Sequence, residues 1–117
     1  MSRMVEIVIE KPRFEENPPP LLIMGISESK EYAKYSRHLD SKTVEYLKEI
    51  LVGKIFTGKI GTSLLLPLGS NYKIGKILLV GLGNPDKLTE ETARIAAGKI
   101  AIKSREINEP NFSIFPI

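Results

Sequence analysis

The chain has 117 residues, of which 42% are hydrophobic and 26% charged, and it contains no cysteine. This length and balance are typical of one globular domain, and the lack of cysteine excludes disulfides, thiolate nucleophiles and zinc-cysteine sites. The formal net charge of +3 comes from basic residues spread along the chain, which disfavours nucleic-acid binding as the main role. No apolar run reaches the ~20 residues of a membrane span. We therefore expect a cytoplasmic protein without a membrane partner.

The first forty residues predict a strand, a loop, a second strand and a short helix. Apolar and acidic residues alternate over 5–10, which is typical of a strand with one wetter face. Residues 11–20 hold four of the eight prolines and cannot form a ladder or a helix. The apolar run LLIMGI at 21–26 predicts the second strand, and the polar residues at 27–39 favour a short helix.

A second helix is expected after Asp40 or Ser41, either of which can act as its N-cap. Gly53 is expected to end this helix. Four apolar residues fall on one face of it at helical spacing and predict its buried side: Val44, Leu47, Ile50 and Leu51.

The second half predicts two buried strands, a long helix and a last strand. The runs at 62–68 and 77–80 are apolar and too short for helices. Thr89 is the expected N-cap of the long helix, with two acidic residues in its first turn. FSIFPI at 112–117 predicts a fifth strand. The expected buried face of the long helix consists of Ala93, Ala96, Ala97 and Ile100.

Apolar strands that alternate with helices indicate a sheet covered on both sides. We therefore predict a three-layer α/β fold for residues 1–117, with 77–80 as a central strand buried on both faces.

The run ILLVGLG at 77–83 is compared first with a dinucleotide-binding fingerprint, which needs three glycines. Gly81 and Gly83 fit the first two positions, but Asp86 stands where the third belongs. A carboxylate there would repel a pyrophosphate, so a tight strand-to-helix connection is the better interpretation. GSNYKIGK at 69–76 has the wrong spacing for a P-loop and predicts a turn between strands.

Candidate acid–base and metal-binding residues are few. His38 is the only histidine and follows Arg37 in a polar stretch, so it is expected at the surface. The pairs Glu15-Glu16 and Glu90-Glu91 are adjacent in sequence and point in different directions, which rarely suits one metal ion. Ser63 lies in an expected buried strand rather than in a nucleophile elbow. The sequence thus predicts no catalytic, cofactor-binding or metal-binding residue in this chain.

Three consecutive motifs are similar to the N-terminal domain of the leucyl (cytosol) aminopeptidase family. FTGKIGTSLLLPL matches that family's Gly-Lys-x-Gly turn and leucine-rich strand, through Gly58, Lys59, Gly61 and residues 64–66. KILLVGLG matches the next strand. The helix that follows matches the family pattern, with the glutamate one place off in spacing, at Thr89, Glu91, Arg94, Ala96, Ala97 and Gly98. The resemblance is strong over residues 56–101, and before them it is only topological.

The resemblance implies a macro-like three-layer domain that is a non-catalytic partner of a larger C-terminal peptidase domain. It also implies two divalent metal ions, zinc or manganese, in that peptidase domain, and a homo-oligomer, a hexamer in the family. The family's N-T-D-A-E-G-R signature does not occur in this sequence. The sequence continues for one expected strand beyond the long helix, so we expect either a fragment or a shortened stand-alone relative.

Two alternatives to the aminopeptidase domain remain open at this point. Macro-like folds elsewhere hold ADP-ribose above the strand ends, which makes a stand-alone ligand-binding module the first alternative. Weak nucleic-acid binding is the second, because the chain is basic and some aminopeptidase relatives are also DNA-binding proteins.

Overall fold

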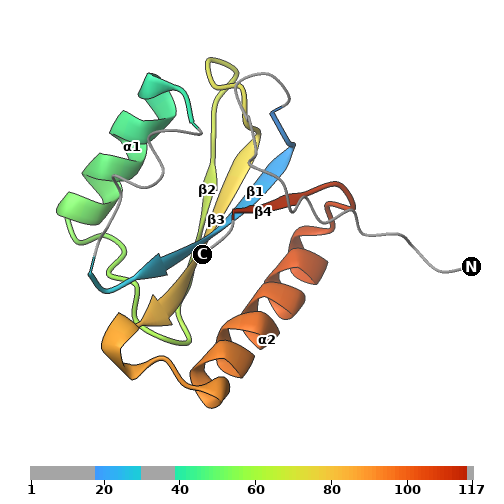
Figure 1. Ribbon diagram of the computed structural model, residues 1–117. Coiled ribbons are helices and arrows are strands. Elements are labelled where there is room, and N and C mark those ends of the chain that lie inside the picture. The colour runs from blue at the N-terminus through green and yellow to red at the C-terminus, as the bar shows by residue number, and fades with distance from the viewer. Residues whose placement is uncertain (1–17, 30–38, 116–117) are drawn as a thin grey trace, which may run out of the picture.

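The computed structural model describes residues 18–29 and 39–115, which form an α/β fold (Figure 1). The elements follow one another as β1 (Leu21–Ser27), α1 (Ser41–Val52), β2 (Ser63–Pro67), β3 (Lys76–Gly83), the short 3-10 helix η2 (Pro85–Lys87), α2 (Glu90–Ile107) and β4 (Ser113–Phe115). The strand expected at 5–10 lies outside the described residues, as does most of the helix expected at 27–39.

The described strands form one mixed sheet in the order β2-β3-β1-β4. β1 runs parallel to both β3 and β4, whereas β2 runs antiparallel to β3. Because β1 and β3 have a strand on each side, they are the central strands and are apolar on both faces, as the sequence predicts. The expected central position of residues 77–80 is confirmed, since all four are buried.

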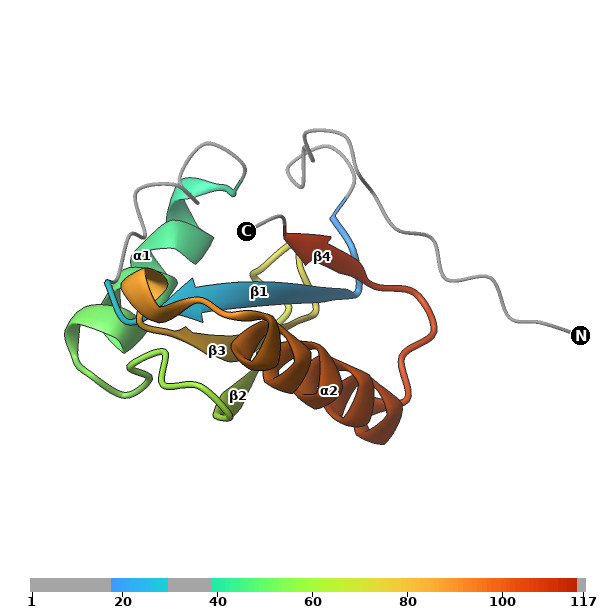
Figure 2. The same ribbon diagram turned by 60° about the horizontal axis from the view of Figure 1, so that its bottom comes forward.

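The two helices cover opposite faces of the sheet, and Figure 2 shows α2 lying along its face with α1 on the other side. Alternate strand residues therefore enter different cores. On the α1 face, Met24 and Leu79 pack with Leu47 and Leu51 of the helix. On the α2 face, Leu78 and other strand residues pack against Ala96. The predicted three-layer α/β fold is confirmed.

Helix α1 begins after Asp40 and buries Thr43, Leu47, Ile50 and Leu51. The expected face is thus correct for three residues, while Val44 is only partly buried against the same core. Gly53 does end the helix, but its φ of −73° is not in the left-handed region that glycine commonly adopts after a helix. The residue in the left-handed region is Lys54, with φ 59°.

Two expectations about burial are wrong. The run at 62–68 forms an edge strand in which Leu65 is 38% exposed, because its other edge has no described neighbour. On α2, Ala93 and Ala97 are exposed, and among the expected four residues only Ala96 is buried. The face toward the sheet is instead Ala96 with the partly buried Ile100 and Ile107.

Candidate functional site

The carboxyl ends of β1 and β3 form the first candidate site, because ligands of open α/β sheets bind outside the ends of parallel strands. Gly81 and Gly83 lie inside β3 and not in the connection after it, which corrects the sequence interpretation. The connection to α2 is made by η2, where the Asn84 side chain accepts a hydrogen bond from the Asp86 N–H at 2.8 Å. The two glycines therefore need another explanation.

The loop at 58–62 supplies that explanation, since it folds directly over the end of β3. The Gly81 N–H donates to the Thr62 carbonyl at 2.9 Å, and the Gly83 N–H donates to the Gly58 carbonyl at 2.8 Å. A β-carbon at position 81 would lie 1.8 Å from the Lys59 carbonyl oxygen. Both N–H groups that could cradle a phosphate are thus bonded within the chain, and Gly81 is required for the close approach of the loop.

The N-terminus of α2 carries negative charge of its own. The Thr89 hydroxyl accepts a hydrogen bond from the Thr92 N–H at 3.2 Å, which caps the helix as expected. Glu90 and Glu91 occupy the first turn and are exposed. These carboxylates already complement the helix dipole, so they oppose a phosphate at this end.

The remaining sequence candidates are not brought together. Glu90 pairs with Arg94 at 3.3 Å, and both side chains are largely exposed. His38, Glu15 and Glu16 lie outside the described residues. Within residues 18–29 and 39–115, no three histidine or acidic residues gather as a metal site would require. That the whole chain lacks catalytic, cofactor-binding and metal-binding residues stays a prediction.

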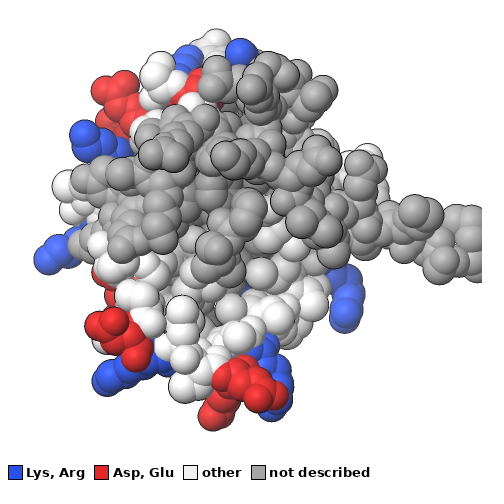
Figure 3. Space-filling view, in the orientation of Figure 1, with Lys and Arg blue, Asp and Glu red and all other residues white. Residues whose placement is uncertain are grey.

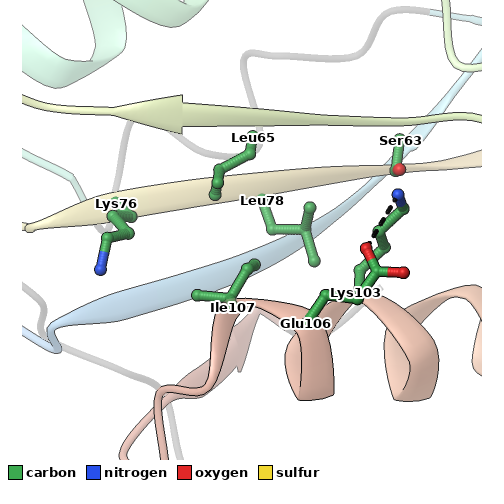
Figure 4. A pocket seen from close by; sticks show the side chains of 7 residues that line it. All are labelled: Ser63, Leu65, Lys76, Leu78, Lys103, Glu106 and Ile107. Atoms are coloured by element: carbon green, nitrogen blue, oxygen red, sulfur yellow. Dashed lines mark hydrogen bonds and ion pairs between the residues drawn. The ribbon is translucent and has the colours of Figure 1, made fainter.

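An open groove of about 360 Å³ lies between the edge of the sheet and α2. Figure 4 shows side chains from β2, β3 and α2 converging on it, with Leu65 and Leu78 in the middle. Lys76 lies at one end, and Ser63 lies at the other near Lys103 and Glu106, whose charged groups are 3.2 Å apart. The groove can hold an apolar group between Lys76 at one end and the Lys103–Glu106 ion pair at the other, and its lining has no nucleophile–base pair. We name it the β2 groove.

The β2 groove was missed in the sequence because residues 62–68 were interpreted as buried. Pro67 was the available signal, since proline within a strand indicates an edge position. Ser63 thus belongs to a half-buried edge strand that borders a groove.

The described charged side chains on one face of the molecule are not segregated by sign. On the face drawn in Figure 3, the blue and red side chains are interspersed around the rim. This distribution does not favour a polyanion. Neither of the two described helices has the length and apolar composition needed to cross a membrane.

These features define a class of protein: a small α/β domain whose strand ends are closed by its own loop and whose open surface is a sheet edge. The family described as "Cytosol aminopeptidase family, N-terminal domain" matches residues 23–110. The chain belongs to this family. The match begins in β1 and so extends well before residue 56, where the resemblance in the motifs starts.

Several curated relatives carry the name "Probable cytosol aminopeptidase". The relative from Rippkaea orientalis is 38% identical over 79 residues, which cover 62% of this chain and 16% of the relative. The relative from Thermosynechococcus vestitus is 42% identical over 67 residues, or 57% of this chain and 14% of the relative. The relative from Methylobacillus flagellatus is 31% identical over 100 residues, which cover 86% of this chain and 20% of the relative. The chain therefore matches no more than about a fifth of the length of these relatives.

Proposed function

We propose that residues 1–117 are a single macro-like, non-catalytic domain of a cytoplasmic, metal-dependent leucyl aminopeptidase. In this proposal the domain packs on a C-terminal peptidase domain, helps the subunits of a homo-oligomer to assemble and shapes access to the active site. The two divalent ions, zinc or manganese, belong to the peptidase domain. The hexameric state is an expectation from the family resemblance alone.

The observation that carries this proposal is the family match over residues 23–110. The site geometry supports the non-catalytic role, because metal-assisted hydrolysis needs several carboxylates that converge on an ion and a positive group for the oxyanion. The described acidic side chains at the N-terminus of α2 instead point into solvent or pair with a neighbouring arginine.

The same geometry gives no support to an ADP-ribose module. A diphosphate at the strand ends needs backbone N–H donors, and those of Gly81 and Gly83 are used by the loop at 58–62. No observation on the described residues favours this second function, and we do not propose it.

The proposed role can be tested by exchange with a relative. Three versions of the Rippkaea orientalis protein are compared: intact, lacking the region that matches this chain, and with that region replaced by residues 23–110 of this chain. Light scattering measures the assembly, and release of a chromogenic amine from a leucyl substrate measures turnover. The exchanged version is expected to recover both. If it behaves like the shortened version while the intact protein assembles, the proposed role is wrong.

The chain alone provides the complementary test. The purified protein is expected not to release the amine with added zinc, manganese or magnesium, after removal of host peptidases. Turnover that co-purifies with the chain and disappears when its own acidic residues are replaced would contradict the non-catalytic role.

A further inference from the structure

The outer side of α2, away from the sheet, has no described element lying over it (Figures 1 and 2). Ile95 and Ile102 are 41% and 52% exposed along this helix. They are seven residues apart, which is close to two helical turns, so they lie on one line along α2. Two exposed isoleucines need no explanation by themselves, but the residue between them does.

That residue is a glycine in the middle of α2, where glycine destabilises a helix relative to alanine. Gly98 is exposed, its φ is not positive, and a β-carbon there would meet no atom within 4 Å. The described part of the chain therefore gives no reason for a glycine at this position. The lack of a side chain does allow the backbone of another chain to approach closely.

Opposite charges lie two helical turns to either side of Gly98. Glu91 precedes it by seven residues and Arg105 follows it by seven, so the three residues lie nearly on one line along α2. Glu91 and Arg105 are exposed, and neither has an ion-pair partner among the residues that the structure describes. The outer side of α2 thus carries an acid, a glycine and a base at equal spacing.

We propose that this side of α2 associates with the same side of a second copy, with the two helices antiparallel and crossing at Gly98. The two-fold axis then places Glu91 of each copy beside Arg105 of the other. Ile95 and Ile102 lie three positions before and four positions after the crossing point, so Ile95 of each copy packs on Ile102 of the other. Helices that cross at a glycine can have axes about 8 Å apart, and a glutamate and an arginine side chain can bridge that separation.

The charges are the reason for choosing this occupant and this orientation. A parallel pair would place Glu91 beside Glu91 of the other copy. In the antiparallel pair, the Glu90 and Arg94 side chains near each end already pair with each other at 3.3 Å. One acid, Glu91, and one base, Arg105 of the other copy, therefore remain to pair at each end. The equal spacing around Gly98 makes this match occur twice in a pair of identical helices.

The proposed contact is small. Helix α2 has 18 residues and is about 27 Å long. Contact along one helix buries less than the roughly 1,200 Å² of a stable interface. For the chain alone we therefore expect a weak dimer, with a dissociation constant on the order of 100 µM.

This inference rests on the proposed assembly role and assigns that role to one surface, yet it can fail separately. The exchange experiment above measures assembly of a whole aminopeptidase, whereas the self-association of this chain is measured on the 117-residue protein by itself. A chain that self-associates through α2 while the exchanged protein fails would keep the surface and remove the role.

Sedimentation of the purified chain from about 5 µM to about 1 mM tests the crossing point. Gly98→Gln places a long side chain there and is expected to raise the dissociation constant at least roughly tenfold. The same change should raise the melting temperature, because glutamine favours a helix more than glycine does, so unfolding cannot explain the loss. The matched control is Ala97→Gln, since Ala97 is exposed on the same helix about 100° away from Gly98. This variant is expected to dimerise like the original chain.

A mixing experiment tests the charges and the second copy together. Glu91→Arg and Arg105→Glu each place like charges at both ends of their own dimer, so each alone should associate at least roughly tenfold more weakly. In an equimolar mixture, a pair with one chain of each kind has opposite charges at both ends and should recover most of the lost affinity. Glu45→Arg makes the same charge change at an exposed position of α1 and should dimerise like the original chain.

Circular dichroism checks that each variant is folded, and recovery on mixing could not occur if the two variants were unfolded. A chain that stays monomeric up to about 1 mM overturns the proposal. So does a dimer that Gly98→Gln leaves unchanged, and so does a mixture of the two charge variants that associates no better than either variant alone.

Discussion

The two helices of this domain are stabilised in different ways. Helix α1 has no side-chain hydrogen bond to its N-terminal backbone, no acidic residue in its first turn and no basic residue in its last, yet it buries four side chains. Helix α2 has a capping box at Thr89, acidic residues in its first turn, Arg105 in its last turn and Asn108 in the left-handed conformation after it, yet it buries only Ala96. Tertiary packing dominates in the first helix and local signals in the second.

This difference extends to the sheet faces that the helices cover. The α1 face has a continuous core in which Leu47, Leu51 and Leu79 are at most 1% exposed. The α2 side leaves Ile95 and Ile102 more than 40% exposed. The α1 face should therefore provide most of the free energy of unfolding, while the α2 side has apolar surface available for contacts with other chains.

The largest effect is expected from Leu79→Asp. Leu79 is fully buried in the central strand β3 on the α1 face. An unpaired carboxylate there costs several kcal/mol against a total stability of roughly 5–15 kcal/mol, so the variant should not fold. Circular dichroism and thermal melting check this. A soluble Leu79→Asp chain that melts cooperatively would show that the α1 face is not the main core.

Truncating one apolar side chain on each helix compares the two directly. Leu47→Ala removes a side chain that is 1% exposed and should lower the free energy of unfolding by about 2–5 kcal/mol. Ile102→Ala acts where the side chain is 52% exposed and should change it by no more than about 0.5 kcal/mol. Urea melts at low protein concentration measure both. If the two variants lose the same free energy of unfolding, the α1 face does not contribute more than the α2 side.

The same contrast explains which parts of the fold were predictable. The start of α2 after Thr89 was predicted because capping and first-turn charge are local signals. The strands β1 and β3 were predicted because both of their faces are apolar. The buried face of α2 was predicted incorrectly at Ala93 and Ala97, because small side chains do not distinguish a packed face from an exposed one.

The candidate site was less predictable for the same reason. The sequence disfavours a phosphate role for Gly81 and Gly83 through Asp86, but it does not show that the loop at 58–62 covers the two glycines. That contact joins residues about twenty positions apart, so no local pattern reports it. The exposed position of Leu65 depends likewise on which strand lies at the edge of the sheet.

Substitutions at two glycines compare the end of β3, which the loop at 58–62 covers, with the exposed surface of α2. Gly81→Ala places a β-carbon 1.8 Å from the Lys59 carbonyl and should cost about 1–3 kcal/mol as the loop is displaced. Gly98→Ala, in the middle of α2, meets nothing within 4 Å and should gain roughly 0.5–1 kcal/mol from helix propensity. Thermal melts measure whether Gly81→Ala lowers the stability and Gly98→Ala raises it. A neutral Gly81→Ala would mean that the loop does not depend on this contact.

The smallest effect is expected at the cap of α2. Thr89→Ala removes the hydroxyl that accepts the Thr92 N–H, and such losses cost about 1 kcal/mol. Because α2 is held by local signals, the loss should concentrate in its first turn, where the amides should exchange with solvent faster. Thr89→Ser keeps the acceptor and is the control, expected to restore both stability and protection. If Thr89→Ala leaves the exchange of these amides unchanged, the helix is held by packing on the sheet after all, and the contrast with α1 does not stand.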